Sequence, residues 1–214
     1  EGGAEALEWE ASDQAGRPGR TTVVVERSTG HRHITGEATA STFHEVPPAL
    51  LHAHLPDTKL IVLVRNPVDR AFSHHRMYRR FTAGGYDLGV PVGEFEPDVH
   101  REMRAHLDGQ ATLYIGPGAY VDLLDGWAAV YGRGRVRVFV TEELGRPRGA
   151  RRIMAELEEY LGLPAHDYGG ILERRFNRAP SASMQPALRA ELAEFYRPYN
   201  NRLQAWLGRD LDWH

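Results

Sequence analysis

Apolar residues follow two different periods along this chain, and each period predicts one kind of element. Residues 59–64 read KLIVLV, a nearly continuous aliphatic run that predicts a strand covered on both faces, as in a parallel sheet surrounded by helices. Residues 135–140 read RVRVFV, which alternates and then ends apolar, so a second strand is predicted there. The short segments 22–26 and 32–37 predict two further extended pieces.

The helical spacing of apolar residues predicts the other main elements. Asn66 followed by Pro67 is a capping residue followed by a residue suited to the first helical position, so a helix is expected to begin at Pro67. Gly162 is the expected stop signal of another helix. Further helices are predicted over residues 47–55, 118–131, 150–161 and 186–207, the last of them interrupted near Pro198.

Strands that alternate with helices predict an α/β fold, a sandwich with a mainly parallel central sheet. The chain has 214 residues, of which 42% are apolar, and this bounds it to a single domain with a real core. Residues 1–20 are rich in glycine, alanine and charge, so this stretch is expected to be loose.

Composition excludes several kinds of partner and chemistry. The chain has no cysteine, which excludes a disulfide scaffold, a thiolate zinc site and a cysteine nucleophile, and favours a reducing cytoplasm. The formal net charge of −3 gives no general attraction to nucleic acid or to an anionic membrane. No apolar run approaches the roughly 18 to 20 residues of a membrane span. We therefore expect a cytoplasmic protein whose anion site, if present, is local.

The stretch from Lys59 to Phe81 carries the strongest chemical signal. Arg65 stands where a buried strand ends and a helix begins, which is where α/β proteins place ligands. Its guanidinium and the first amides of the helix could hold a phosphate without a lysine, and Ser73 could face the same ligand. The alternative is that Arg65 pairs with Asp69 and that Ser73 is a solvated helix residue.

The segment RNPVDRAFSHH, residues 65–75, resembles the 3′-phosphate-binding motif of the sulfotransferases. The resemblance is to the carbohydrate branch related to heparan sulfate N-sulfotransferase and its bacterial relatives. It implies a P-loop-kinase-like fold and a donor, 3′-phosphoadenosine 5′-phosphosulfate (PAPS), whose 3′-phosphate would be bound by the matching residues Arg65 and Ser73.

The resemblance covers most of the chain, from about residue 34 to residue 213. It implies further donor-binding residues: Tyr120, which matches a G-x-Y segment, and Arg178 and Ser181 on a loop that closes over the nucleotide. Tyr120 is also a reasonable core residue, and the alternative for Arg178 is a solvated side chain on a flexible arginine-rich loop. The other similar segments are 36–43 (GEATASTF), 113–127 (LYIGPGAYVDLLDGW), 136–144, 153–164 and 189–213.

One family feature has no counterpart in the sequence. Sulfotransferases of this branch open with a strand and a P-K-x-G-T-T loop that grips the 5′-phosphosulfate. Lys59, the only lysine, precedes the 3′-phosphate strand and cannot serve, and residues 19–22 (GRTT) match by coincidence. Because the chain begins with Glu1, we expect the missing strand and loop upstream.

The remaining roles implied by the resemblance concern the acceptor. Glu37, in the GE position, is the best candidate for the base that takes the acceptor's proton, and equally a buried carboxylate that orders nearby loops. Thr39 could contact substrate, or act in capping. His74 is free to face the cleft and contact the acceptor, whereas His75 belongs to the apolar stripe and is expected to be a core histidine.

A metal site is not expected, because the eleven histidines lack the i, i+4 spacing with a nearby carboxylate that zinc sites use. The residues and the resemblance together predict a sulfotransferase that moves a sulfuryl group from PAPS to a hydroxyl or amine. Its acceptor would be a carbohydrate or secondary metabolite, free or carrier-bound. The alternative is a non-catalytic module that keeps the 3′-phosphonucleotide half-site and has lost the transfer loop. The arginine-rich composition favours a bacterial source.

Overall fold

The computed structural model describes residues 5–12, 18–25, 34–39, 41–173 and 183–213. The chain divides into two compact units, each described by itself below. The first consists of Glu1–Ala40 with Met77–Gly93, and the second of Ser41–Arg76 with Glu94–His214. Among the described residues, the helices are too short or too polar to cross a bilayer.

The first unit contains an antiparallel hairpin of β1 (Glu5–Ser12) and β2 (Pro18–Val25). Residues 22–25 of the strand predicted at 22–26 lie in β2, and within the stretch 1–20, which is expected to be loose, residues 5–12 form β1 and residues 18–20 begin β2. The segment EALEWEAS alternates apolar and acidic positions over Leu7–Ala11, a period-2 pattern that forms a strand once a partner is in register. Residues 34–39 form neither helix nor strand, unlike the extended piece predicted for 32–37.

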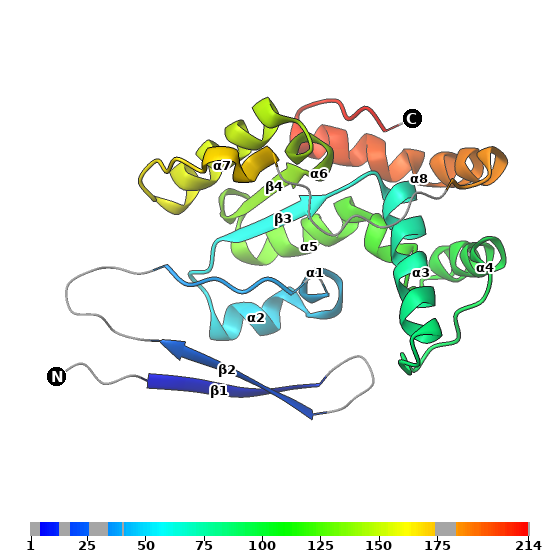
Figure 1. Cartoon of the computed structure of the whole chain (residues 1–214), viewed down its shortest axis with the longest axis horizontal. Helices are drawn as coiled ribbons and strands as arrows, with labels where there is room; N and C mark the ends of the chain where they lie inside the picture. Colours follow the sequence, from blue (N-terminus) through cyan, green and yellow to red (C-terminus); the bar gives the residue numbers. More distant parts are fainter. Residues whose placement is uncertain (1–4, 13–17, 26–33, 40, 174–182, 214) are drawn as a thin grey trace. The chain divides into compact units, whose positions relative to one another are not determined.

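The second unit is built on two parallel strands, β3 (Leu60–Val64) and β4 (Val136–Val140), paired in register from Leu60 opposite Val136 to Val64 opposite Val140. Helix α3 (Pro67–Ala83) follows the end of β3, and the short α6 (Thr141–Leu144) follows the end of β4 (Figure 1). The parallel pairing confirms the predicted α/β fold. It also brings both strand-to-helix junctions to one edge of the sheet.

The remaining helices agree with the sequence in most places. The predicted helices at 47–55, 118–131 and 150–161 are confirmed as α2, α5 and α7, and Gly162 ends α7 in the left-handed conformation, with φ of 72°. Helices α1 and α4 were not predicted. The bounds of the helices not yet given are α1 Thr42–Glu45, α2 Pro48–His54, α4 Phe95–Leu107, α5 Tyr120–Tyr131, α7 Pro147–Leu161 and α8 Pro186–Leu207. Short 3-10 helices lie at Gly116–Gly118, Arg133–Arg135 and Gly169–Glu173.

Helix α8 continues through Pro198, so the predicted interruption is wrong. A proline inside a helix removes one backbone hydrogen bond and crowds the carbonyl four residues earlier. Here the loss is offset by burial, because Leu192, Tyr196 and Leu203 lie on one apolar face that spans the proline. Pro198 itself is exposed.

One face of the sheet carries the core. Val64, Val136 and Val140 pack with Leu124 and Trp127 of α5 in one buried cluster, and Leu203 of α8 joins them. Burying apolar surface of this kind stabilises by roughly 25 cal/mol per Å². The core therefore fixes the strands against α5 and α8 and holds the carboxyl edge of the sheet in place.

The other face of the sheet is only partly covered, contrary to the prediction for β3. Helix α7 packs over the β4 side, where the Tyr160 hydroxyl donates to the Arg135 carbonyl at 2.6 Å. On the β3 side, Ile61 and Leu63 remain 43% and 55% exposed. Within the described residues, β3 pairs with β4 alone, so its outer edge has no strand neighbour there. Its second face, with Ile61 and Leu63, is only partly covered.

Candidate functional site

The turn from β3 into α3 is capped by its own side chain. Asn66 Oδ1 accepts the amides of Val68 at 3.0 Å and Asp69 at 3.4 Å, which confirms Asn66 as the cap. Pro67 has no amide to offer. The expectation that the first helical amides bind an anion is therefore wrong, because those donors already have partners.

The two amides before the helix are held by side chains from elsewhere in the second unit. The Arg65 amide donates to the Tyr120 hydroxyl oxygen at 3.3 Å, and the Asn66 amide donates to Glu142 Oε1 at 2.7 Å. Burial raises the pKa of Tyr120, which keeps its phenol neutral. An anion at this junction must therefore be bound by side chains and not by the backbone.

The Arg65 side chain is the exposed cation of the junction. Asp69, its alternative partner in the sequence, forms an ion pair with Arg189 of α8 instead. In the part of the chain that the structure describes, the Arg65 guanidinium has no hydrogen-bonding or ion-pair partner. The guanidinium is therefore available for a bidentate interaction with an anion from solvent.

Ser73 lies on α3, four residues after Asp69, so the two share a face of the helix. Its side chain is half-buried, and its hydroxyl forms no hydrogen bond among the described residues. The pairing of Arg65 and Ser73 around one phosphate remains a prediction. The structure places both on the segment that leaves the carboxyl end of β3.

Arg70 is the second cation of the same turn, and it points inward. Arg70 Nη2 donates a hydrogen bond to the Tyr114 carbonyl. Arg70 Nε is buried and has no hydrogen-bonding partner among the described residues. Arg70 helps to lower the pKa of two nearby histidines, His44 and His74. The site therefore has a buried positive charge behind it and an exposed one, that of Arg65, in front.

His74 is a neutral side chain in this environment. Burial, followed by the positive charge of Arg70, lowers the pKa of His74 to about 4. Burial likewise lowers the pKa of His44, on α1. His74 packs edge-on against the Tyr114 ring, with centroids 5.6 Å apart. The side chain is half-buried, so its predicted freedom to face a cleft is reduced.

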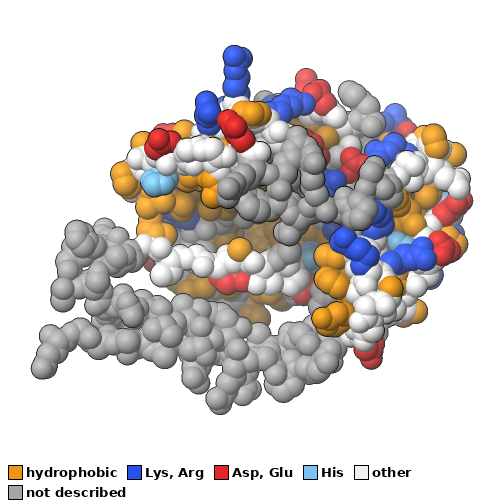
Figure 2. Space-filling model, viewed as in Figure 1, with side chains coloured by type: hydrophobic (Ala, Val, Ile, Leu, Met, Phe, Trp, Pro, Cys, Tyr) orange, Lys and Arg blue, Asp and Glu red, His pale blue; other side chains and the backbone are white. Residues whose placement is uncertain are grey.

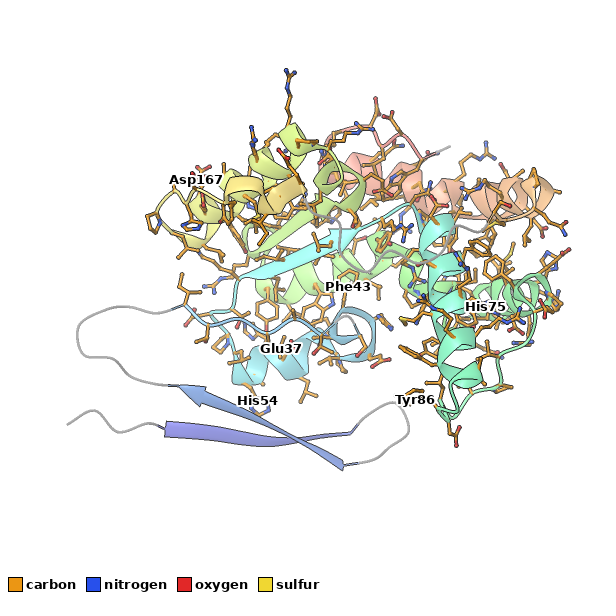
Figure 3. All side chains as sticks on the ribbon, viewed as in Figure 1. Glu37, Phe43, His54, His75, Tyr86 and Asp167 are labelled. Carbon is orange, nitrogen blue, oxygen red and sulfur yellow. The ribbon has the colours of Figure 1, made fainter. Side chains whose placement is uncertain are left out.

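His75 is the core histidine that the apolar stripe predicted, with 1% of its surface exposed. Its Nε2 lies 3.3 Å from Asp98 Oδ2, and the other Asp98 oxygen accepts from Arg101 at 2.8 Å. His75 thus ties α3 to α4 (Figure 3). This contact fixes the helix that carries Ser73.

The loop from Thr112 to Ala119 is held by residues that the sequence analysis did not single out. The carboxylate of Glu102 accepts three consecutive amides, at 2.7 to 3.1 Å, and the Tyr196 hydroxyl donates to the Ile115 carbonyl at 2.9 Å. A Cβ at Gly118 would lie 2.8 Å from the Tyr196 hydroxyl, so glycine is required for this approach. The three amides belong to Leu113, Tyr114 and Ile115.

The predicted acceptor residues Glu37 and Thr39 belong to the first unit. Both are exposed, and the Thr39 hydroxyl donates to Glu37 Oε1, so Glu37 is not the buried carboxylate of the alternative interpretation. Arg178 and Ser181 lie outside the described residues. The structure thus brings Arg65 and Tyr120 together at the end of β3, carries Ser73 and His74 further along α3, and holds Glu37 with Thr39 in another segment.

Arg70, Glu142 and Glu102 are the contributors that sequence reasoning missed. The only local signal was for Arg70, in the D-R-A part of the RNPVDRA segment. Glu142 accepts an amide 76 residues away in sequence, and Glu102 accepts amides up to 13 residues away. These partners are brought together only by the tertiary fold.

The structure defines an α/β protein with an exposed arginine, Arg65, at the carboxyl edge of a parallel sheet, which is where this class of protein binds ligands. The family model described as "Sulfotransferase family" matches residues 4–124, more than half of the chain. The chain belongs to the sulfotransferase family.

Comparisons with individual proteins agree with this membership. Heparan sulfate glucosamine 3-O-sulfotransferase 6 of Homo sapiens is 31% identical over 202 residues, covering 84% of this chain and 56% of that protein. Carbohydrate sulfotransferase 15 of Homo sapiens is 24% identical, covering 83% of this chain and 38% of that protein. The chain thus spans about half the length, or less, of these curated relatives.

A solved sulfotransferase from Alicyclobacillus acidocaldarius shares the fold. The two chains superpose with a TM-score of 0.57 and 26% identity, covering 80% of this chain and 63% of the other. The predicted α/β class and the family resemblance are therefore both confirmed.

Proposed function

We propose that this protein transfers a sulfuryl group from PAPS to a hydroxyl or amine of a carbohydrate or secondary-metabolite acceptor. The observation that carries the proposal is the exposed Arg65 guanidinium, which lies at the carboxyl end of β3 and has no carboxylate partner among the described residues. Arginine binds phosphate in a planar, bidentate manner. Membership of the sulfotransferase family supports a 3′-phosphorylated nucleotide as the ligand.

The residues take roles that follow the in-line displacement of sulfuryl transfer. Arg65 and Ser73 bind the 3′-phosphate, and the Tyr120 hydroxyl accepts the Arg65 amide and so helps to position Arg65. Arg178 and Ser181 complete the donor site. Glu37 takes the acceptor's proton, and its contact with the Thr39 hydroxyl gives the carboxylate a fixed orientation for that role. His74 and Thr39 contact the acceptor, and no metal is needed for these steps.

The acceptor class rests on the relatives, whose names include heparan sulfate glucosamine and carbohydrate sulfotransferases. The described side chains on the face in Figure 2 are a mixture of basic and acidic ones, and the proposed acceptor is a glycan or a small molecule, free or carrier-bound. We also propose a bacterial, cytoplasmic setting. It is supported by the absence of cysteine and by the single lysine.

We further propose that both units belong to one sulfotransferase domain completed by a strand and a 5′-phosphosulfate loop. The support is β3, whose outer edge has no strand neighbour among the described residues. A strand edge with unpaired backbone groups is normally paired or protected, and the same strand has Ile61 and Leu63 about half exposed on its second face. A strand added beside β3 would place its loop at the same edge as Arg65.

The product nucleotide 3′-phosphoadenosine 5′-phosphate (PAP) is expected to raise the melting temperature of the full-length protein more than adenosine 5′-monophosphate (AMP), which lacks the 3′-phosphate. At about 100 times the Kd, binding stabilises by about 2.7 kcal/mol, or about 5 to 10 °C for a domain of this size. Differential scanning fluorimetry measures both shifts. Equal shifts with PAP and AMP would contradict the proposal.

Turnover separates the enzyme from the non-catalytic module. The full-length enzyme is expected to release PAP from PAPS in the presence of an acceptor, measured by chromatography of the nucleotides. PAP binding without any release across glycan and small-molecule acceptors would instead favour the binding module. The variant Glu37→Gln is expected to retain PAP binding in either case, because Glu37 acts on the acceptor.

A further inference from the structure

Glu142 occupies an unusual position for a carboxylate beside a proposed phosphate site. It lies on α6, directly after β4, and its Oε1 accepts the Asn66 amide at 2.7 Å. Its other oxygen, Oε2, is buried and has no hydrogen-bonding partner among the described residues. A negative charge near a bound phosphate weakens binding by repulsion, so a role for Glu142 must come from what it holds.

The group that Glu142 holds is the backbone next to Arg65. The Arg65 amide is held by Tyr120 of α5, and the next amide by Glu142 of α6. Two consecutive peptide groups are thus attached to two different helices at the point where β3 ends. A hydrogen bond to a charged acceptor is about twice as strong as a neutral one, so the Glu142 bond is the stronger of the two.

The contact that Glu142 does not make is equally informative. Glu142 uses its carboxylate on the amide and not on the neighbouring guanidinium, since no ion pair of Arg65 is found among the described residues. The backbone is therefore fixed while the Arg65 charge stays available to solvent. A carboxylate paired with the guanidinium itself would compete with an incoming phosphate.

We propose that Glu142 is a positioning residue: it fixes the peptide that carries Arg65, so that the guanidinium is pre-oriented for the 3′-phosphate. This rests on the proposed function, in which Arg65 binds that phosphate. Pre-orientation raises affinity because the side chain loses less freedom on binding. Glu142 acts through Arg65 and touches no ligand, so its effect is confined to the phosphate that Arg65 binds.

Isothermal titration calorimetry of PAP and AMP on the full-length protein tests this role. The ratio of the two Kd values reports the contribution of the 3′-phosphate alone. Glu142→Ala is expected to reduce this ratio about tenfold, since it removes a charge-assisted hydrogen bond. Glu142→Gln keeps an acceptor of the same reach and is expected to restore the ratio to within about threefold of wild type.

A matched control is Glu143→Ala, because Glu143 is the next carboxylate on α6 and pairs with Arg152 and Arg209 at 2.7 Å. It is expected to leave the ratio unchanged. A ratio unaltered in Glu142→Ala, or lowered equally by Glu143→Ala, would overturn the proposal. If Glu142→Ala does not fold, Glu142→Asp keeps the charge but shortens the reach to the Asn66 amide, and an unaltered ratio in that variant would overturn the proposal as well.

The two proposals fail in different ways. A wild-type protein that binds PAP no more tightly than AMP would remove the proposed function, and the role of Glu142 with it. A wild type that prefers PAP, together with a Glu142→Ala variant that keeps the same preference, would leave the proposed function intact and remove the role of Glu142 alone.

Discussion

Arg65→Ala is expected to weaken PAP binding about 100-fold while AMP binding changes less than about threefold. The reason is that the exposed guanidinium supplies a bidentate, charge-assisted contact to the 3′-phosphate that no other described side chain at this junction is free to replace. Ser73→Ala removes one neutral hydrogen bond and is expected to cost about fivefold. Isothermal titration calorimetry at constant salt measures each effect.

Arg65→Lys gives a second prediction from the same geometry: it should recover only part of the loss, because an ammonium lacks the planar fork. The control is Arg197→Ala, which removes an exposed arginine paired with Glu194 at 2.5 Å on α8. Equal weakening of PAP binding by Arg65→Ala and Arg197→Ala would contradict a specific role for Arg65, since the effect would then be one of general surface charge.

The folded protein is expected to lose stability as the pH falls from about 6.5 toward 4, in part because of His74. In the unfolded chain a histidine has a pKa of 6.5, whereas burial and Arg70 lower the pKa of His74 to about 4 in the fold. Between these values the unfolded state binds the additional proton, so acidification favours unfolding. Each pH unit between the two pKa values is worth about 1.4 kcal/mol of unfolding free energy. Solvent screening at the partly exposed His74 reduces the sum, so the expected loss of unfolding free energy is about 2 kcal/mol.

Urea unfolding at a series of pH values measures this loss. His74→Gln removes the titrating group and is expected to flatten the profile above pH 4, although burial also lowers the pKa of His44, so some slope remains. His54→Gln, at an exposed histidine of α2, serves as the control and should keep the wild-type profile. A His74→Gln profile as steep as that of the wild type would show that the histidine is not buried as described.

The segment from β3 into α3 could be predicted from sequence because all of its signals are local. An aliphatic run, an Asn-Pro cap and a helical stripe follow one another within residues 59–81, and the structure has the strand, the cap and the helix there. The stripe also identified His75 as a core residue. Local backbone preferences and burial act in the same direction in this segment.

Other parts depend on contacts that no local pattern records. Helix α4 has many charged residues around its buried Phe95 and Val99, so its apolar face is weak in the sequence. It is stabilised in part by a tertiary contact, that of the buried Asp98 with His75. The exposure of Ile61 and Leu63 depends on which strands and helices are present beside β3. The hydrogen bond from the Asn66 amide to Glu142 joins residues 76 positions apart in sequence, so only the assembled sheet brings them together.

The most direct test is a crystal structure of the full-length protein with PAP bound. We expect the 3′-phosphate to lie within hydrogen-bonding distance of both the Arg65 guanidinium and the Ser73 hydroxyl, beyond the carboxyl end of β3. A 3′-phosphate bound elsewhere, with Arg65 and Ser73 both turned away from the nucleotide, would contradict it.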